Sequence, residues 1–87
     1  MAKVHIPAAI RSLTNGLSVS EVSGATVGAA IEALEAQYPG IKARLIEDGR
    51  LKPGLALFVD GEQADRGLAA RINPNSEVYF TPAISGG

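Results

Sequence analysis

The feature of this 87-residue chain that most restricts its fold is a single amphipathic helix near its middle. Apolar side chains recur there at helical spacing, and alanines with high helix propensity fill the positions between them. Thr26 is suited to cap the helix and Pro39-Gly40 to end it. One apolar stripe needs one apolar surface, so we expect the other segments to form a layer against it. The stripe consists of Val27, Ile31, Leu34 and Tyr38.

A short strand is predicted at the start of the chain. Val4 and Ile6 alternate with polar neighbours, which indicates a half-buried strand whose Val4 and Ile6 face the core. Pro7 has no amide hydrogen to donate, so the regular pairing of this strand is expected to end there.

A hairpin is predicted from the Asn15-Gly16 dipeptide, which favours a tight turn between strands. On this interpretation the first strand continues irregularly through Ile10 and Leu13. The second strand covers residues 17–21, where apolar and polar residues alternate, and Ser23-Gly24 closes it.

The segments after the helix alternate between turns and strands. In chain order they are a helical turn at 41–46, a polar loop at 47–54, strands at 55–59 and 62–64 around Asp60-Gly61, a helical turn at 68–72, a turn at 73–76, and a last strand at 77–81 that Pro82 ends. This order predicts an α+β fold of the β-grasp (ubiquitin-like) type, a roll in which a mixed sheet of four to five strands packs on one main helix. The first and last strands would pair in parallel at the centre. We expect one domain over residues 1–82 and a flexible tail over residues 83–87.

Composition excludes several classes of function. The chain has no cysteine and one histidine, which argues against disulfides, thiolate chemistry and a zinc site. Its net charge is −1 and its basic residues are scattered, which argues against nucleic-acid and membrane partners. The longest strongly apolar run, residues 55–59, is too short to span a membrane, and no signal peptide is visible. A cytoplasmic, monomeric protein is the expectation.

The last residues, Gly86-Gly87, place a free carboxylate on a tail that follows an apolar strand. This carboxylate is ionised at neutral pH and can attack the α-phosphate of ATP when an enzyme holds it. Two residues without a Cβ can pass through a narrow cleft. A frayed terminus with no function is the simpler alternative.

The sequence resembles the MoaD/ThiS family of ubiquitin-like sulfur carriers over its whole length. The residues that carry the resemblance are Val4-His5-Ile6-Pro7, Thr26-Val27-Gly28, Leu34-Glu35, Tyr38-Pro39-Gly40-Ile41, Phe58-Val59-Asp60-Gly61 and the block from Glu77 to Gly87. The Ile6-Pro7 start, Tyr38 to Ile41 and Gly67-Leu68 are closest to the CysO-like branch, which is linked to cysteine synthesis. Asp60 stands where the family often has asparagine.

The resemblance implies a mechanism and a set of partners. An E1-like adenylating enzyme would use ATP to convert the Gly87 carboxylate to an acyl-adenylate, with Gly86 giving clearance in its cleft. A sulfur donor would replace AMP and leave a thiocarboxylate on Gly87. The sulfur would then pass to a synthase that resembles either cysteine synthase or molybdopterin synthase. The carrier itself would be no enzyme, with no catalytic residue, metal or cofactor of its own.

Alternation along the strands predicts where a partner docks. Val4, Ile6, Leu57, Val59, Val78 and Phe80 are expected to face the helix. His5, Phe58 and Tyr79 would then meet on the open face of the sheet, as a patch of the kind that binds other proteins. Alternatively, the loop at 47–54 covers them, or they only cover the sheet. With the tail, the predicted partner-binding set is His5, Phe58, Tyr79, Pro82, Ile84 and Ser85.

Two other functions fit the same sequence. The activated Gly87 could form an amide with a lysine, which would make the chain a protein modifier. The domain could also be a plain interaction module with an idle tail. An enzyme is the weakest interpretation, since the sequence has no glycine-rich phosphate loop, metal cluster or nucleophile–base pair.

Overall fold

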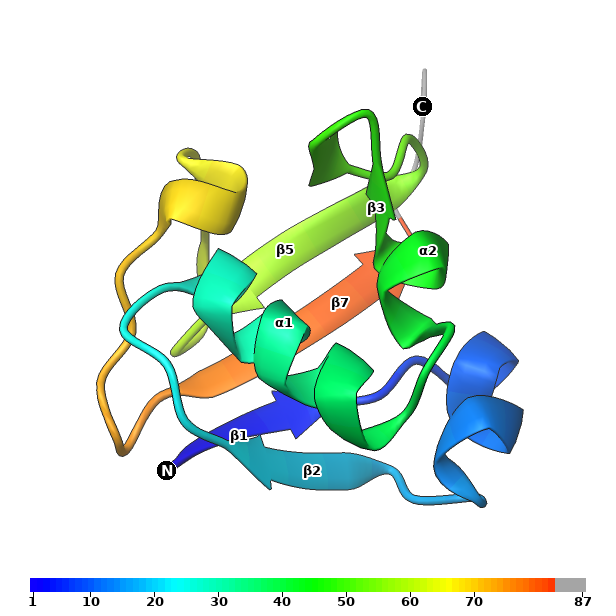
Figure 1. The fold of residues 1–87 in the computed structure, drawn as a ribbon. Coiled ribbons are helices and arrows are strands. Elements are labelled where there is room, and N and C mark those ends of the chain that lie inside the picture. The colour runs from blue at the N-terminus through cyan, green and yellow to red at the C-terminus, as the bar shows by residue number, and fades with distance from the viewer. Residues whose placement is uncertain (83–87) are drawn as a thin grey trace.

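A computed structural model shows a five-stranded mixed sheet with one long helix across one of its faces (Figure 1). It describes residues 1–82, Pro82 by its backbone alone. The predicted tail, residues 83–87, lies outside the described residues. The strand order is β2-β1-β7-β5-β6, which is the predicted β-grasp arrangement. The strands are β1 (Ala2–His5), β2 (Val19–Val22), β5 (Leu55–Val59), β6 (Glu62–Gln63) and β7 (Glu77–Pro82).

The first and last strands pair in parallel at the centre of the sheet, as predicted. In this pairing Val4 lies opposite Val78, and both side chains are buried. β2 and β5 add to the two sides in antiparallel orientation. Because β1 and β7 each lie between two other strands, this pair holds the two ends of the domain together.

The predicted helix is confirmed as α1 (Val27–Gln37). The Oγ1 atom of Thr26 accepts a hydrogen bond from the backbone N–H of Ala29 at 3.1 Å, so Thr26 is the N-cap. The side chains of Val27, Ile31 and Leu34 have no exposed area, because they pack on the inner face of the sheet. Tyr38 is half-buried against the same core, as its place in the stripe predicts.

The predicted irregular strand after Pro7 is wrong. Residues Ala8–Thr14 form a 3₁₀ helix, η1, and Asn15 ends it in the left-handed conformation, with φ 56°. Asn15-Gly16 therefore ends a helix and does not form a two-residue hairpin turn. The hydroxyl of Thr14, which is fully buried, stabilises this connection by hydrogen bonds to Arg11 O and Leu17 O. β2 begins only at Val19 as a result.

Two other connections also differ from prediction. The loop expected at 47–54 contains a small hairpin, β3 (Ile46–Glu47) and β4 (Arg50–Leu51), whose turn uses positive φ at Asp48 and Gly49. The helical turn expected at 68–72 is a 3₁₀ helix, η2, at Gly67–Ala69. The helical turn expected at 41–46 is confirmed as α2 (Ile41–Leu45), with both terminal side chains buried.

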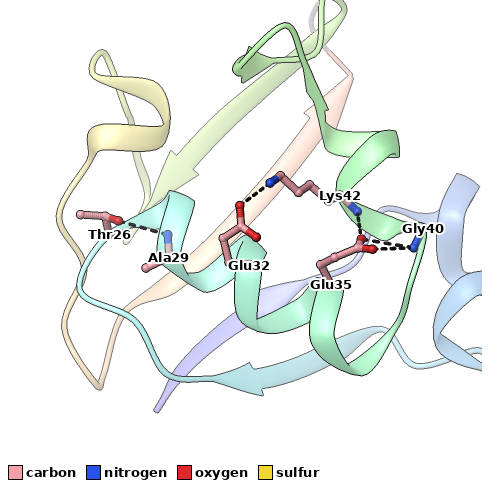
Figure 2. A network of polar contacts seen from close by, with 6 residues as sticks. All are labelled: Thr26, Ala29, Glu32, Glu35, Gly40 and Lys42. Atoms are coloured by element: carbon pink, nitrogen blue, oxygen red, sulfur yellow. Dashed lines mark hydrogen bonds and ion pairs between the residues drawn. The ribbon is translucent and has the colours of Figure 1, made fainter.

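Glu35 joins the end of α1 to the start of α2 (Figure 2). Its carboxylate accepts hydrogen bonds from the backbone N–H groups of Lys42, at 2.9 Å, and Gly40, at 3.1 and 3.2 Å. These two N–H donors, that of Lys42 above all, hold the pKa of Glu35 below its usual value. Glu32, one helical turn before Glu35 in α1, contacts the ammonium group of Lys42. The sequence periodicity of α1 predicts only that Glu35 points outward. In the structure its side chain caps the N-terminus of α2.

We predict that Glu35→Gln destabilises the fold in a pH-dependent way. The lowered pKa means that folding favours the ionised carboxylate, so its stabilisation is complete well above about pH 4.3, the ordinary glutamate value. It is lost as the pH falls through the lower pKa of the folded protein. Thermal unfolding of both proteins between pH 7 and pH 3 should show a midpoint difference at pH 7 that closes at acid pH.

Glu32→Gln is the matched control for this experiment. It removes the same charge from the same helix, but Glu32 contacts only the exposed Lys42 side chain and no backbone N–H group among the described residues. Exposed ion pairs stabilise proteins little, so its midpoint should move less at pH 7. A midpoint difference for Glu35→Gln that stays constant down to pH 3 would contradict the capping role of the ionised carboxylate.

Candidate functional site

The open face of the sheet, opposite α1, carries a row of three ring side chains. His5 on β1 lies opposite Tyr79 on β7, and Tyr79 lies opposite Phe58 on β5. The row therefore crosses three neighbouring strands at one level, as the alternation predicts. We call His5, Tyr79 and Phe58 the aromatic row. Tyr79 is 39% exposed, one of three large hydrophobic residues that stand open to solvent among residues 1–82, and the other two rings are half-buried.

The aromatic row is held in a defined geometry. The rings of His5 and Tyr79 stack with centroids 3.8 Å apart and planes 9° from parallel. The Nε2 atom of His5 donates to Oε1 of Glu77 at 2.9 Å, two residues before Tyr79 on the same face. Glu77 was not singled out by the sequence analysis, although its spacing of two from Tyr79 places it on the same face. The hydrogen bond and the stack together restrict the rotation of both rings.

The predicted inner face is also confirmed in its main part. Val4, Ile6, Leu57, Val78 and Phe80 are buried beneath α1, and Val59 is half-buried at the side of the core. The hairpin of β3 and β4 contacts α2 and η2, which lie on the α1 side of the sheet. The alternative in which the chain at 47–54 folds over the aromatic row is therefore wrong for the hairpin. The row stays accessible from the open face.

The rest of the predicted partner-binding set follows β7 along the chain. The backbone of Pro82 pairs with Leu55 at the end of β7, so the central strand reaches the start of the tail. Ile84, Ser85, Gly86 and Gly87 lie outside the described residues. What the structure defines is their base, the end of β7, which pairs with β5.

Two other kinds of site are absent from residues 1–82. In this range no group of His, Asp or Glu side chains is placed to hold a metal ion. Neither helix of the described chain has the length and apolar character needed to cross a bilayer.

Comparisons with known proteins agree on one family. Residues 4–87 match the ThiS family. The sulfur carrier protein CysO of Mycobacterium tuberculosis is 37% identical over 89 residues, which cover 97% of this chain and 96% of the relative. Small archaeal modifier protein 3 of Haloferax volcanii is 37% identical over 65 residues, which cover 72% of this chain and 71% of that protein.

A solved structure of a relative shares the whole fold. The crystal structure of the BexX/CysO complex of Amycolatopsis orientalis contains a chain that superposes with a TM-score of 0.90 at 32% identity, with all of both chains covered. The relative in that crystal is bound to another protein. This superposition confirms the β-grasp fold that the element order predicts, even though some element boundaries differ from prediction.

We predict a measurable coupling between His5 and Tyr79. A double-mutant cycle with His5→Ala, Tyr79→Ala and both together should give a coupling free energy of about 0.5–1.5 kcal/mol, the usual value for a stacked ring pair. Chemical denaturation at a single pH measures the free energy of unfolding of the wild type, the two single variants and the double variant.

A second cycle, between His5 and Gln63, serves as the control. Gln63 lies opposite Phe58 on β6, three strands away from His5 at the same level. At this distance two substitutions should be additive within about 0.5 kcal/mol. Equal coupling in the two cycles would show that the stack contributes nothing specific.

Proposed function

The chain belongs to the ThiS family, and from this we propose that it is a sulfur carrier protein, itself a substrate and not an enzyme. The observation that supports this most directly is the match over residues 4–87, which includes the terminal Gly86-Gly87. The CysO relatives, which are sulfur carriers, align with nearly the full length of the chain. We propose that the sulfur is carried as a thiocarboxylate on Gly87.

The proposed reaction begins at the Gly87 carboxylate, in the active site of a separate E1-like adenylating enzyme. A carboxylate oxygen attacks the α-phosphorus of ATP, pyrophosphate leaves, and an acyl-adenylate forms. A sulfide equivalent then attacks the acyl carbon and AMP leaves with the electron pair of the broken bond. AMP is a good leaving group and oxide is not, which is why activation has to come first. The carrier needs no cofactor of its own, because ATP is used by the partner.

The fold supplies a firm base for this chemistry. β7 is paired on both sides, and its last paired residue, Pro82, leads directly into the tail. We propose that the aromatic row docks on the partner while Pro82, Ile84 and Ser85 enter its cleft ahead of Gly86 and Gly87. A domain that is held on the partner keeps a short tail near the active site at a high effective concentration.

The sulfur acceptor is proposed from the relatives. Similarity to CysO favours a cysteine-synthase-like partner over a molybdopterin-synthase-like one. Cysteine-free composition suits the cytoplasm, where we place the protein, and we take the free form to be a monomer.

Protein modification is the second candidate, and the similarity to small archaeal modifier protein 3 favours it specifically. Both functions share the acyl-adenylate and differ in the nucleophile that follows. Sulfide gives a thiocarboxylate, whereas a lysine amine gives an amide to another protein. Covalent ladders on target proteins would therefore identify the modifier.

The decisive experiment is an intact-mass measurement on protein purified from its native cells, with and without alkylation. We expect a species in which one oxygen is replaced by sulfur, localised by fragmentation to Gly87 and shifted by the alkylating reagent. A matched sample of a variant without Gly86 and Gly87 should lack it. If only the carboxylate is found, even after ATP, sulfide and the host adenylating enzyme are added, the carrier function is wrong.

We predict that Gly86→Ala slows adenylation without changing the fold. The added Cβ would meet the walls of the cleft that holds the tail, and a displacement of about 1 Å at a reacting group can slow a reaction roughly a hundredfold. ATP–pyrophosphate exchange should therefore show a lower kcat, while the thermal midpoint stays that of the wild type. Ala83→Gly, further from the carboxylate, is the control. An unchanged kcat for Gly86→Ala would contradict a tight cleft around the tail.

A further inference from the structure

Charged side chains on the open face gather on one side of the aromatic row. Lys3 on β1 lies opposite Glu21 on β2 and opposite Glu77 on β7. Asp60, directly after β5, exchanges hydrogen bonds with the backbone of Glu77, so it continues the same level. We call these four residues the acidic row, since three carboxylates stand with one ammonium group. It lies two residues, or about 6–7 Å, before the aromatic row along the strands.

On the opposite side of the aromatic row, the next paired residues on β7 and β5 are uncharged. Two residues further along the strands, Thr81 on β7 pairs with Ala56 on β5. The open face therefore changes from acidic to aromatic to small and uncharged in the direction of the tail. The whole chain has a net charge of only −1, so the acidic row, with three carboxylates and one ammonium group, is more negative than the molecule as a whole.

The carboxylates of the acidic row keep capacity for another partner. The side chain of Glu77 is 48% exposed, and its bond to His5 uses one oxygen. Glu21 is exposed and makes no hydrogen bond to another side chain among the described residues, nor does Lys3 form an ion pair there. Both glutamates border an open polar hollow of about 260 Å³, together with Lys3 and Asn75. A hollow of this size and polarity has room for a cationic side chain of another protein.

We propose that the partner that docks on this face is a protein with an arginine beside an apolar centre, the arginine entering the hollow between Glu21 and Glu77. The inference rests on the proposed function, and it deepens it by assigning a chemistry to the surface of the adenylating enzyme. The apolar centre covers the aromatic row, where burial of Tyr79 supplies contact area.

An arginine fits this hollow better than a lysine. Its planar guanidinium can donate two parallel hydrogen bonds to one carboxylate, and it is more weakly hydrated than an ammonium group. Arginine is also enriched in the centres of protein interfaces together with aromatic residues. Because the acidic row is at the rim of the face, its charges act mainly on the rate of encounter and on the docking register.

The test compares two pairs of substitutions that remove the same charge. Glu21→Gln with Glu77→Gln neutralises the acidic row, and glutamine at 77 can still accept a hydrogen bond from His5. Glu47→Gln with Asp65→Asn removes two exposed carboxylates outside the open face, in β3 and in the turn before η2. The probe is the adenylating enzyme of the host, which is followed during purification by its ATP–pyrophosphate exchange activity with the wild-type carrier. Exchange is measured against carrier concentration at low and high salt.

We expect the first pair to raise KM for the carrier roughly tenfold at low salt with kcat unchanged, and to reduce the salt dependence of KM. The control pair should behave as the wild type, and both should keep its thermal midpoint within a few degrees. Glu77→Lys, which reverses one charge, should raise KM further.

The inference is overturned if the two pairs have equal KM values, or if KM for the wild type does not change with salt. In either case, exchange and thiocarboxylate formation by the wild type would leave the proposed function standing. Absence of exchange with the wild-type protein would overturn the proposed function and this inference with it.

Discussion

The parallel pairing of β1 with β7 is the interaction on which the rest of this structure depends. It joins residues more than seventy positions apart in sequence, so the chain between them has to close before the core can form. With β1 and β7 in place, Val4 and Val78 present one apolar surface to α1. The same pairing fixes where β7 ends, at Pro82, and therefore where the tail begins.

The register of this pairing also creates the open face. Side chains alternate between the two faces, so a shift of one residue in β7 would bury Tyr79 and expose Val78. Only the observed register places His5 beside Tyr79 at stacking distance and lets Glu77 reach the imidazole. The core and the open face are consequently specified by one set of backbone hydrogen bonds. Because the apolar side chains of the inner face fix this register, they also keep the aromatic row aligned.

Period and spacing in the sequence were enough to predict the sheet, the helix and the aromatic row, because each follows from alternation or from one apolar stripe. They failed at some of the connections. Asn15-Gly16 favours left-handed backbone both in a hairpin turn and after a 3₁₀ helix, and only the buried Thr14 hydroxyl, with its two carbonyl partners, separates the two cases. The capping role of Glu35 was equally hidden, since its partners are backbone groups of the next helix. Long-range polar contacts of this kind leave no periodic signal.

The proposed docking charges lie beside the start of β7, and the proposed reaction site follows its end in the sequence. Glu77 in the acidic row and Pro82 at the base of the tail are five residue steps apart on one strand, about 16–17 Å. This exceeds the Debye length at physiological salt, about 8 Å, so exposed charges at one end act weakly on a reaction at the other. A change in the acidic row can therefore alter how often a partner is found without altering the environment of the reacting carboxylate. This separation suits a carrier that binds more than one enzyme. The charges of the acidic row can differ between carriers while the tail keeps one sequence that fits every active site.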